Sequence, residues 1–495
     1  MTAINPDAHV AVIGGGIAGL AAAYFLRAGQ AGEGAPGARA RVTVFESSPR
    51  AGGKLAVSEV AGIPVDEGAE AMLARRPEGT SLVAAAGLGD QLVSPGTTSA
   101  SIWTRGRLRP MPARQVMGVP GDLRALARSR VVSPAGVTRA ALERLLPPVG
   151  LDGDVSVARL IGSRFGREVV DRLVEPLLGG VYAGRADQLS VEATLPALAG
   201  AVRDGHRRSV SAAAASLLPP APAGDDPRPP VFTTLAGGLG TLPPAIVERL
   251  AASGAEVRTR STVRELRRTA EGWRLTVGSA HDPRQVDADA VVLAVPARPA
   301  SRLLAADVPA AAAALGEIEY ASMAIVTLAY RGSAFGGGPG APAGSGYLVP
   351  AVDGRAVKAV TFSTVKWPHL RDSGRAVAVR CSIGRIGEEH LLQRGDEELA
   401  ETAAAELAAA TGVREAPVET RVSRWGGALP QYAVGHLGRV AGIRAAVAAE
   451  PGLAVCGAAY DGLGIPACVA TARDAAARIG EYLARRPASA ADGRQ

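Results

Sequence analysis

The chain has 495 residues, enough for two or three domains, and 47% of them are hydrophobic, so a sizeable core can form. The net charge is +7, and arginine supplies almost all of the positive charge. The sequence has no basic block with interleaved aromatic residues, so nucleic-acid binding is not expected. Three scattered cysteines and six unclustered histidines lack metal-ligand spacing, so we expect no metal site, no disulfide framework and a reducing, cytoplasmic location.

The first predicted elements are a buried strand over residues 10–13 and a helix over residues 18–27. The two elements belong to an uncharged, apolar run over residues 10–26, which is shorter than a membrane span of about 20 residues. No Lys or Arg precedes this run, whereas an export signal begins with basic residues. Between the two elements, Gly14, Gly16 and Gly19 follow the spacing G-x-G-x-x-G. This spacing permits a tight turn, close approach of a pyrophosphate and close packing of helix on strand, and thus predicts a dinucleotide site.

A second strand over residues 42–46 ends in Glu46, after an enlarged surface loop predicted for residues 28–41. A carboxylate in this place accepts hydrogen bonds from both ribose hydroxyls of an adenosine and repels a 2′-phosphate. Strand, glycine turn, helix, strand and acid therefore occur in the order that dinucleotide binding requires.

Further along the chain, helical periodicity dominates residues 111–215, and strand patterns return near residue 255. We expect a discontinuous nucleotide-binding domain from residues 1–85, 235–300 and 422–486. An α+β domain from residues 86–110 and 301–421 is threaded through it, together with a helical insertion over residues 111–215. Low complexity at residues 216–230 and a polar tail at residues 487–495 predict disorder.

Five further stretches carry a family resemblance when they are taken together in chain order: ESSPRAGGKLA, VDEGAEAMLARRP, VEPLLGGVYAGR, RWGGALPQYAVGH and DGLGIPACVATARDAA. Together they resemble the flavin-dependent porphyrinogen oxidases of haem synthesis over about residues 8–485. The resemblance implies an α/β fold with a discontinuous Rossmann-like FAD-binding domain, an inserted α+β substrate domain and a helical subdomain. It also implies non-covalent FAD as the cofactor.

Carried over position by position, the resemblance implies these contacts. Gly14, Gly15, Gly16, Ile17, Ala18 and Gly19 hold the FAD diphosphate, and Glu46, with Ser47 beside it, holds the ribose. Lys54 lies on the path from diphosphate to flavin, and the backbone of Val263 meets the adenine. Gly68, Ala69, Glu70, Ala71, Trp425, Gly464, Ile465 and Pro466 lie along the flavin. The chain departs from the family where Ala467 and Cys468 follow Pro466 in place of an acidic residue.

For the substrate, the resemblance implies a propionate-bearing porphyrinogen and molecular oxygen. Because arginine binds carboxylates in a bidentate manner, Arg75 and Arg76 are the first candidates for substrate binding, and Tyr182 and Arg185 in GGVYAGR are the second. A solvated surface pair and turn-forming core residues are the structural alternatives. No general base is assigned, since the cofactor performs the oxidation.

The leading expectation for the reaction is the six-electron oxidation of coproporphyrinogen III to coproporphyrin III, because the soluble members of the family favour that substrate. Protoporphyrinogen IX oxidation is the close alternative. A flavin amine oxidase, a carotenoid desaturase and a non-catalytic FAD- or porphyrin-binding protein stay open. The apolar run at residues 116–119 with its neighbouring arginines suggests either peripheral membrane contact or a substrate entrance. The sequence leaves the oligomeric state undetermined.

Overall fold

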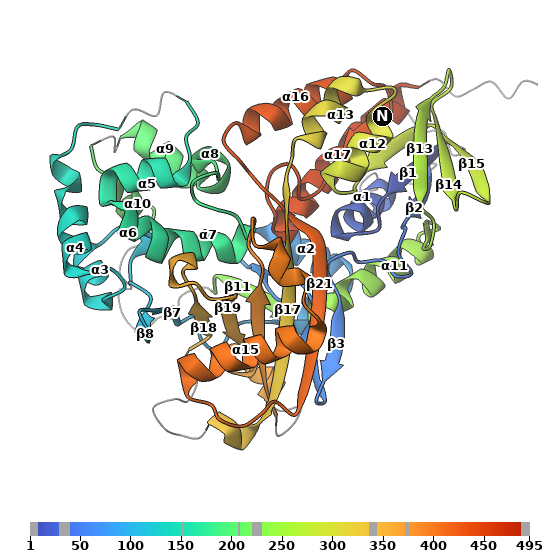
Figure 1. The fold of residues 1–495 in the computed structure, drawn as a ribbon. Coiled ribbons are helices and arrows are strands. Elements are labelled where there is room, and N and C mark those ends of the chain that lie inside the picture. Colours follow the sequence, from blue (N-terminus) through green and yellow to red (C-terminus); the bar gives the residue numbers. More distant parts are fainter. Residues whose placement is uncertain are drawn as a thin grey trace, which may run out of the picture.

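The computed structural model describes residues 8–28, 40–149, 153–205, 208–219, 230–335, 344–371 and 376–486. Most of the loop predicted at residues 28–41 lies outside the described residues. The same holds for residues 220–229 of the predicted disordered segment and for the whole tail at residues 487–495. The described chain forms three lobes, with a parallel sheet at the upper right of Figure 1, helices at the left and a large sheet below.

The parallel sheet has five strands in the order β12-β2-β1-β16-β22. Strand β1 lies at its centre, where Val10 faces Val42 of one neighbour and Ala290 of the other. Its sequence HVAVI is buried throughout, as expected of a parallel strand with both faces covered by helices. The strands are β1 (His9–Ile13), β2 (Arg41–Phe45), β12 (Glu256–Arg258), β16 (Ala290–Leu293) and β22 (Leu453–Val455).

Helices cover both faces of this sheet. One face packs on α1 (Ile17–Ala28), α2 (Pro77–Ala85), α11 (Leu242–Ala252) and α17 (Ile465–Arg485). The other packs on α12 (Ala297–Leu304), α13 (Pro309–Gly316), α16 (His436–Ala448) and the antiparallel sheet β13 (Val263–Arg268), β14 (Trp273–Gly278) and β15 (Pro283–Ala288). Helix α17 begins two residues before the predicted start because Pro466, with its fixed backbone angle, occupies its first turn.

The large sheet has seven strands in the order β21-β17-β20-β19-β18-β7-β8. Helix α15 (Asp396–Thr411) packs on one face, and the hairpin β3 (Val57–Val60) and β4 (Ile63–Asp66) contacts the other. In chain order the strands are β7 (Ala100–Thr104), β8 (Arg107–Pro110), β17 (Tyr320–Arg331), β18 (Gly346–Leu348), β19 (Val357–Phe362), β20 (Ala376–Ile383) and β21 (Glu419–Pro430). A smaller sheet joins β5 (Met72–Leu73), β11 (Phe232–Leu235) and β6 (Leu92–Val93).

The helical lobe has its own core. Its helices are α3 (Leu123–Ser129), α4 (Pro134–Ala141), α5 (Val157–Phe165), α6 (Arg167–Val169), α7 (Glu175–Tyr182), α8 (Val191–Thr194), α9 (Pro196–Asp204) and α10 (Val210–Ser216). Inside it, Arg164 pairs with Glu143, whose side chain is fully buried. Glu143 also accepts a hydrogen bond from the amide of Val210 at 2.7 Å, so one carboxylate joins three segments of the lobe.

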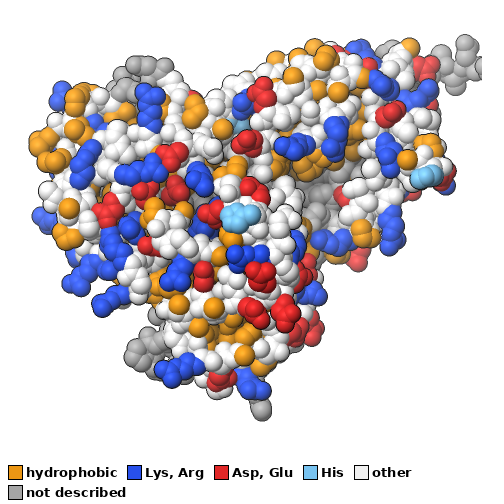
Figure 2. Space-filling view, viewed as in Figure 1, with side chains coloured by type: hydrophobic (Ala, Val, Ile, Leu, Met, Phe, Trp, Pro, Cys, Tyr) orange, Lys and Arg blue, Asp and Glu red, His pale blue; other side chains and the backbone are white. Residues whose placement is uncertain are grey.

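The apolar run at residues 116–119 packs inward. It forms the hairpin β9 (Gln115–Val116) and β10 (Val119–Pro120), in which Val119 is fully buried and Val116 and Met117 pack against the helical core. These side chains therefore offer little apolar surface to a bilayer, and membrane contact stays a prediction. Arginines do gather over this lobe, at the lower left of Figure 2. Among the described helices, none has the length and hydropathy to cross a membrane.

The α/β fold class is confirmed, whereas the predicted domain division stays a prediction and its boundaries differ from the observed sheets. The prediction assigns residues 422–430 to the nucleotide-binding domain, yet they lie in β21, which pairs with β17 in the large sheet. It assigns residues 301–316 to the substrate domain, yet α12 and α13 pack on the parallel sheet. Both differences depend on pairing between residues far apart in sequence, which local patterns do not record.

Candidate functional site

The glycine turn between β1 and α1 is closed by backbone contacts at two glycines and open at the third. The Gly14 amide donates to the Phe45 carbonyl at 2.8 Å, and its φ of +106° favours glycine. A Cβ added to Gly19 would lie 1.8 Å from the Gly14 oxygen, so helix and turn touch. A Cβ added to Gly16 would have no atom of the described residues within 4 Å. The turn thus opens outward only where a pyrophosphate is expected.

Glu46 lies directly beside this turn. Its carboxylate accepts hydrogen bonds from the amides of Gly15 and Ser48, each at 2.7 Å, and from the Ser47 hydroxyl at 3.3 Å. The backbone carbonyl of Glu46 accepts from the Ser261 amide at 2.8 Å, which brings Val263 at the start of β13 into the neighbourhood. A carboxylate has about four acceptor positions, so Glu46 keeps capacity for a ribose hydroxyl.

A second group of predicted residues continues from the turn. Gly16 bridges to Gly52, and a Cβ on the neighbouring Gly53 would lie 3.2 Å from the Gly16 Cα. A Cβ on Gly68 would lie 2.1 Å from the Lys54 carbonyl oxygen and 3.4 Å from the Trp425 ring. The structure therefore brings the glycine turn, Lys54, Gly68 and Trp425 into one continuous row of contacts.

Lys54 and Trp425 connect this row to the large sheet. The Lys54 ammonium donates to the Ala428 carbonyl of β21, and the Trp425 indole donates to the Glu67 carbonyl at 2.8 Å. Burial lowers the pKa of Lys54, while the neighbouring Cys468 opposes that shift. The Lys54 ammonium is thus held where the row of contacts meets the large sheet.

The start of α17 completes the row. A Cβ on Gly79 would lie 3.1 Å from the Pro466 ring and 2.9 Å from the Met72 sulfur, so Pro466 and Met72, which follows Ala71, both pack against Gly79 of α2. Gly464 precedes the helix, and Ile465 begins it. Cys468 is buried, and burial raises the pKa of its thiol to about 11, so it is a neutral thiol near pH 7. At the place where the sequence resemblance implies an acidic residue, the chain thus has an uncharged, small side chain.

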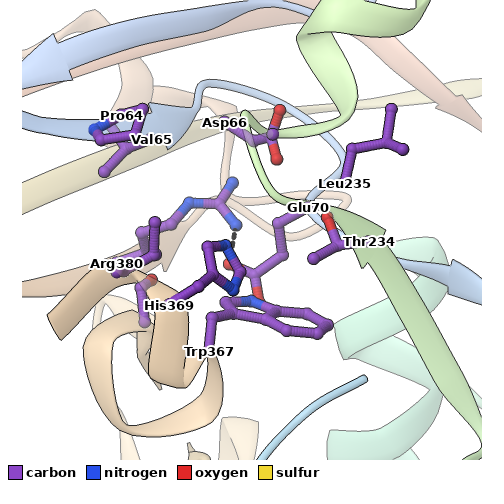
Figure 3. Close-up of a pocket in the computed structure, with 12 residues that line it drawn as sticks. Pro64, Val65, Asp66, Glu70, Thr234, Leu235, Trp367, His369 and Arg380 are labelled. Carbon is purple, nitrogen blue, oxygen red and sulfur yellow. Dashed lines mark hydrogen bonds and ion pairs between the residues drawn. The ribbon is translucent and has the colours of Figure 1, made fainter. Parts of the chain in front are cut away.

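Glu70 points away from this row, into an ion-pair cluster on the large sheet. It binds Lys366 at 2.6 Å and accepts a hydrogen bond from the Trp367 indole at 3.4 Å. It also pairs with Arg380 of β20, as Figure 3 shows. Burial favours the neutral acid, but Lys366 and Arg380 outweigh it and lower the pKa of Glu70 to about 2. Glu70 is therefore ionised, and its carboxylate is a structural anchor.

Replacing Glu70 with Gln is expected to lower the free energy of unfolding at pH 7 by roughly 1–3 kcal/mol, because the buried Arg380 and the half-buried Lys366 lose their partner. A pKa depressed from 4.5 to about 2 adds stability above pH 4.5 that is lost as the pH falls toward 2. The gap between variant and wild type should therefore narrow by roughly 1 kcal/mol at pH 4 in urea titrations. Glu401→Gln, exposed on α15, is the control; an unchanged gap for Glu70→Gln at pH 4 would refute this assignment.

A small cavity lies beside the cluster, with a volume of about 20 Å³. Asp66, Thr234, Ser363 and Arg380 line it (Figure 3). The Thr234 and Ser363 hydroxyls and the Arg380 Nε are buried without a hydrogen-bond partner among the described residues. The volume suits one water molecule and excludes a macrocycle, so the cavity is not a substrate site. Burial raises the pKa of Asp66 to about 6, although amides of Gly240 and Leu239 oppose the shift.

The four predicted substrate residues do not form one group. Arg76 pairs with Glu78 at 3.0 Å, and Glu78 lines a cavity of about 340 Å³ between α1, α2 and α17. Arg75 is exposed. Tyr182 is buried against Tyr432, with ring centroids 5.6 Å apart, and burial raises its pKa to about 12. Arg185 is exposed and donates to the Ile386 carbonyl at 3.4 Å. Their assignment to substrate binding stays a prediction.

The sequence reasoning missed Arg380 and Lys366. Arg380 is a single charge in the apolar run AVAVRCSI, and Lys366 is one of only three lysines in the chain. A lone charge in an apolar run, or a lysine in a chain that almost always uses arginine, could have indicated an ionic contact. Neither feature shows that Glu70 is the partner.

The geometry agrees with comparisons to known proteins. A match to the flavin containing amine oxidoreductase family spans residues 17–480. The coproporphyrinogen III oxidase of Mycobacterium tuberculosis is 38% identical over 95% of this chain and 97% of its own length. The protoporphyrinogen oxidase of Bos taurus is 29% identical over 95% and 98%.

A crystal structure from Exiguobacterium sp. 255-15, provisionally assigned as a protoporphyrinogen oxidase, superposes with a TM-score of 0.81 at 29% identity. It covers 95% of this chain and 98% of its own length. With a family match over nearly the whole chain and a relative that is 38% identical over almost its full length, the chain belongs to the flavin containing amine oxidoreductases and, among them, to the porphyrinogen oxidases.

Proposed function

We propose that the protein binds FAD without a covalent bond and oxidises coproporphyrinogen III to coproporphyrin III with molecular oxygen. The observation that carries the cofactor assignment is the glycine turn, which is packed at Gly14 and Gly19 and open at Gly16. The first amides of α1 lie at this opening, where a helix N-terminus attracts an anion. Glu46 at the end of β2 suits the ribose and disfavours a 2′-phosphate.

The residues in the row support non-covalent binding. The nearby cysteine, Cys468, is buried with its thiol protonated, and none of the cofactor residues proposed from the resemblance is a cysteine or histidine. Acid precipitation should therefore release all yellow colour as free FAD. Colour that stays with the precipitate, or release of FMN alone, would contradict the proposal.

Glu46→Ala is expected to weaken FAD binding by about 1.5–3 kcal/mol, because hydrogen bonds to a charged acceptor are lost. Glu46 also holds the amides of Gly15 and Ser48, so part of the loss comes from a looser turn. Isothermal titration of apoprotein with FAD measures the change. Glu46→Gln keeps an acceptor and should recover part of the affinity, whereas equal affinity of Glu46→Ala and wild type would remove Glu46 from the site.

FAD held by the glycine turn and Glu46 would supply two-electron oxidation chemistry: three rounds would take six electrons from the porphyrinogen, and three molecules of oxygen would be reduced to hydrogen peroxide. The chain's own residues supply position and charge. The Glu67 carbonyl orients Trp425, the Ala428 carbonyl fixes the Lys54 ammonium, and the 67–71 segment connects the cofactor lobe to the large sheet. These groups are held by part-buried contacts within the chain, which supports a site that is largely formed before a ligand binds.

The substrate assignment is supported by the relatives named coproporphyrinogen III oxidase, among them those of Mycobacterium tuberculosis and Bacillus subtilis. Six electrons correspond to three molecules of oxygen, so each coproporphyrin formed should be accompanied by three of hydrogen peroxide. A porphyrin fluorescence assay with a peroxide readout tests this ratio. A single, stoichiometric burst without turnover would instead favour a porphyrin-binding protein.

A further inference from the structure

Residues 67–71 connect β4 to β5 outside any helix or strand, yet groups from other elements hold them firmly. The Glu67 carbonyl accepts from Trp425 at 2.8 Å, and the Glu67 carboxylate pairs with Arg421 of β21 at 3.3 Å. Glu70 pairs with Lys366 at 2.6 Å. The Glu67 amide donates to the Ala56 carbonyl at 2.8 Å. Beyond that backbone bond, these side-chain contacts hold the segment in place.

Arg380 contacts two residues of the segment at once. One terminal nitrogen donates to the Gly68 carbonyl at 2.6 Å, and the other pairs with the Glu70 carboxylate. Arg380 is 7% exposed and projects from β20. The planar guanidinium fixes both bonds at once, so the Gly68 carbonyl and the Glu70 side chain keep one relative orientation.

The other side of the same segment faces the proposed cofactor row. Gly68 packs on the Lys54 carbonyl and next to Trp425, and both belong to the row that starts at Gly16. A displacement of the Gly68 peptide would therefore move backbone at the flavin side, although Arg380 itself lies on the sheet side of the segment.

We propose that Arg380 is a positioning residue that sets the 67–71 backbone against the flavin through its paired bonds to Gly68 and Glu70. The inference rests on the proposed placement of Gly68–Ala71 beside the flavin. It assigns a role in catalysis to a residue of the large sheet, acting through the segment and without touching the substrate.

The test compares Arg380→Lys and Arg380→Gln with the wild-type holoenzyme. A lysine keeps the charge but reaches only one of the two partners, and a glutamine loses the charge. Both variants should therefore shift the long-wavelength absorption band of the bound flavin. Both should also lower kcat about tenfold with KM within about twofold of wild type. The control is Arg385→Gln, since Arg385 is equally buried and binds the carbonyls of Val349 and Arg355 but touches no residue of the segment. It should lose stability and keep the wild-type flavin spectrum.

A wild-type flavin spectrum and kcat in Arg380→Lys would overturn the proposal, even if Arg380→Gln does not fold. A spectral shift of the same size in Arg385→Gln would also overturn it, because the effect would then reflect general loosening of the sheet. If the wild-type enzyme binds FAD but turns over no porphyrinogen, the proposed function fails while the spectral comparison still decides the role of Arg380.

Discussion

Gly16→Ala is expected to weaken FAD binding at least tenfold, or about 1.4 kcal/mol, while the apoprotein keeps its melting temperature. The added methyl group would meet no atom of the described residues within 4 Å, so the fold can accept it. It would project into the opening where the proposed pyrophosphate approaches the backbone. Differential scanning fluorimetry of apoprotein and titration with FAD separate the two effects.

Gly19→Ala is the matched comparison on the same turn. Its methyl group would lie 1.8 Å from the Gly14 oxygen, so helix and turn must separate. Overpacking of this kind costs about 1–3 kcal/mol, and both stability and FAD content should fall. If Gly16→Ala binds FAD as tightly as wild type, the diphosphate does not lie at this turn.

Glu143→Ala is expected to lower the free energy of unfolding by about 3–5 kcal/mol, the largest stability effect of any substitution considered. The change leaves Arg164 buried without its carboxylate and removes acceptors from the Val210 amide and the Ser209 hydroxyl. Urea titration followed by circular dichroism measures the loss. Because these residues belong to the core of the helical lobe, FAD affinity in folded protein should change little.

Arg167→Ala provides the control in the same lobe. Arg167 pairs with Asp171 and Asp187 at the surface, with 55% of its side chain exposed, and exposed pairs contribute about 0–1 kcal/mol. A loss of less than 1 kcal/mol for Glu143→Ala would show that the buried pair is no anchor of the lobe.

Local sequence patterns predicted the nucleotide-binding elements well. Strand β1 begins one residue before its predicted start, and α1 extends the predicted helix by one residue at each end. The bounds of both elements are indicated by apolar runs and by glycines that lie within a few residues of each other. The convergence of Gly16, Lys54, Gly68 and Trp425 could be expected only through the family resemblance, because it depends on contacts across hundreds of residues.

The charged contacts were much harder to predict. Nothing in the sequence shows that Glu70 turns toward Lys366 and Arg380 while its neighbour Gly68 packs on Lys54. Arg75 and Arg76 were chosen for their place after a cofactor segment, but the partner of Arg76 is Glu78, two residues away. Side-chain direction at the end of a two-residue strand such as β5 is set by packing, which periodicity does not reveal.

The choice between two porphyrinogens follows from their charge. Coproporphyrinogen III carries four propionates, whereas protoporphyrinogen IX carries two, with vinyl groups in place of the others. A site built for four carboxylates leaves cations unpaired with the second ring, and sites discriminate strongly against a ligand that lacks an expected polar partner. Partial hydration of those cations limits the loss to about 1–3 kcal/mol.

The most direct test is kcat/KM for coproporphyrinogen III and protoporphyrinogen IX, measured side by side by porphyrin fluorescence at the same oxygen and detergent concentrations. We expect coproporphyrinogen III to be preferred by roughly tenfold to a hundredfold. Equal values, or a preference for protoporphyrinogen IX, would contradict the proposed substrate.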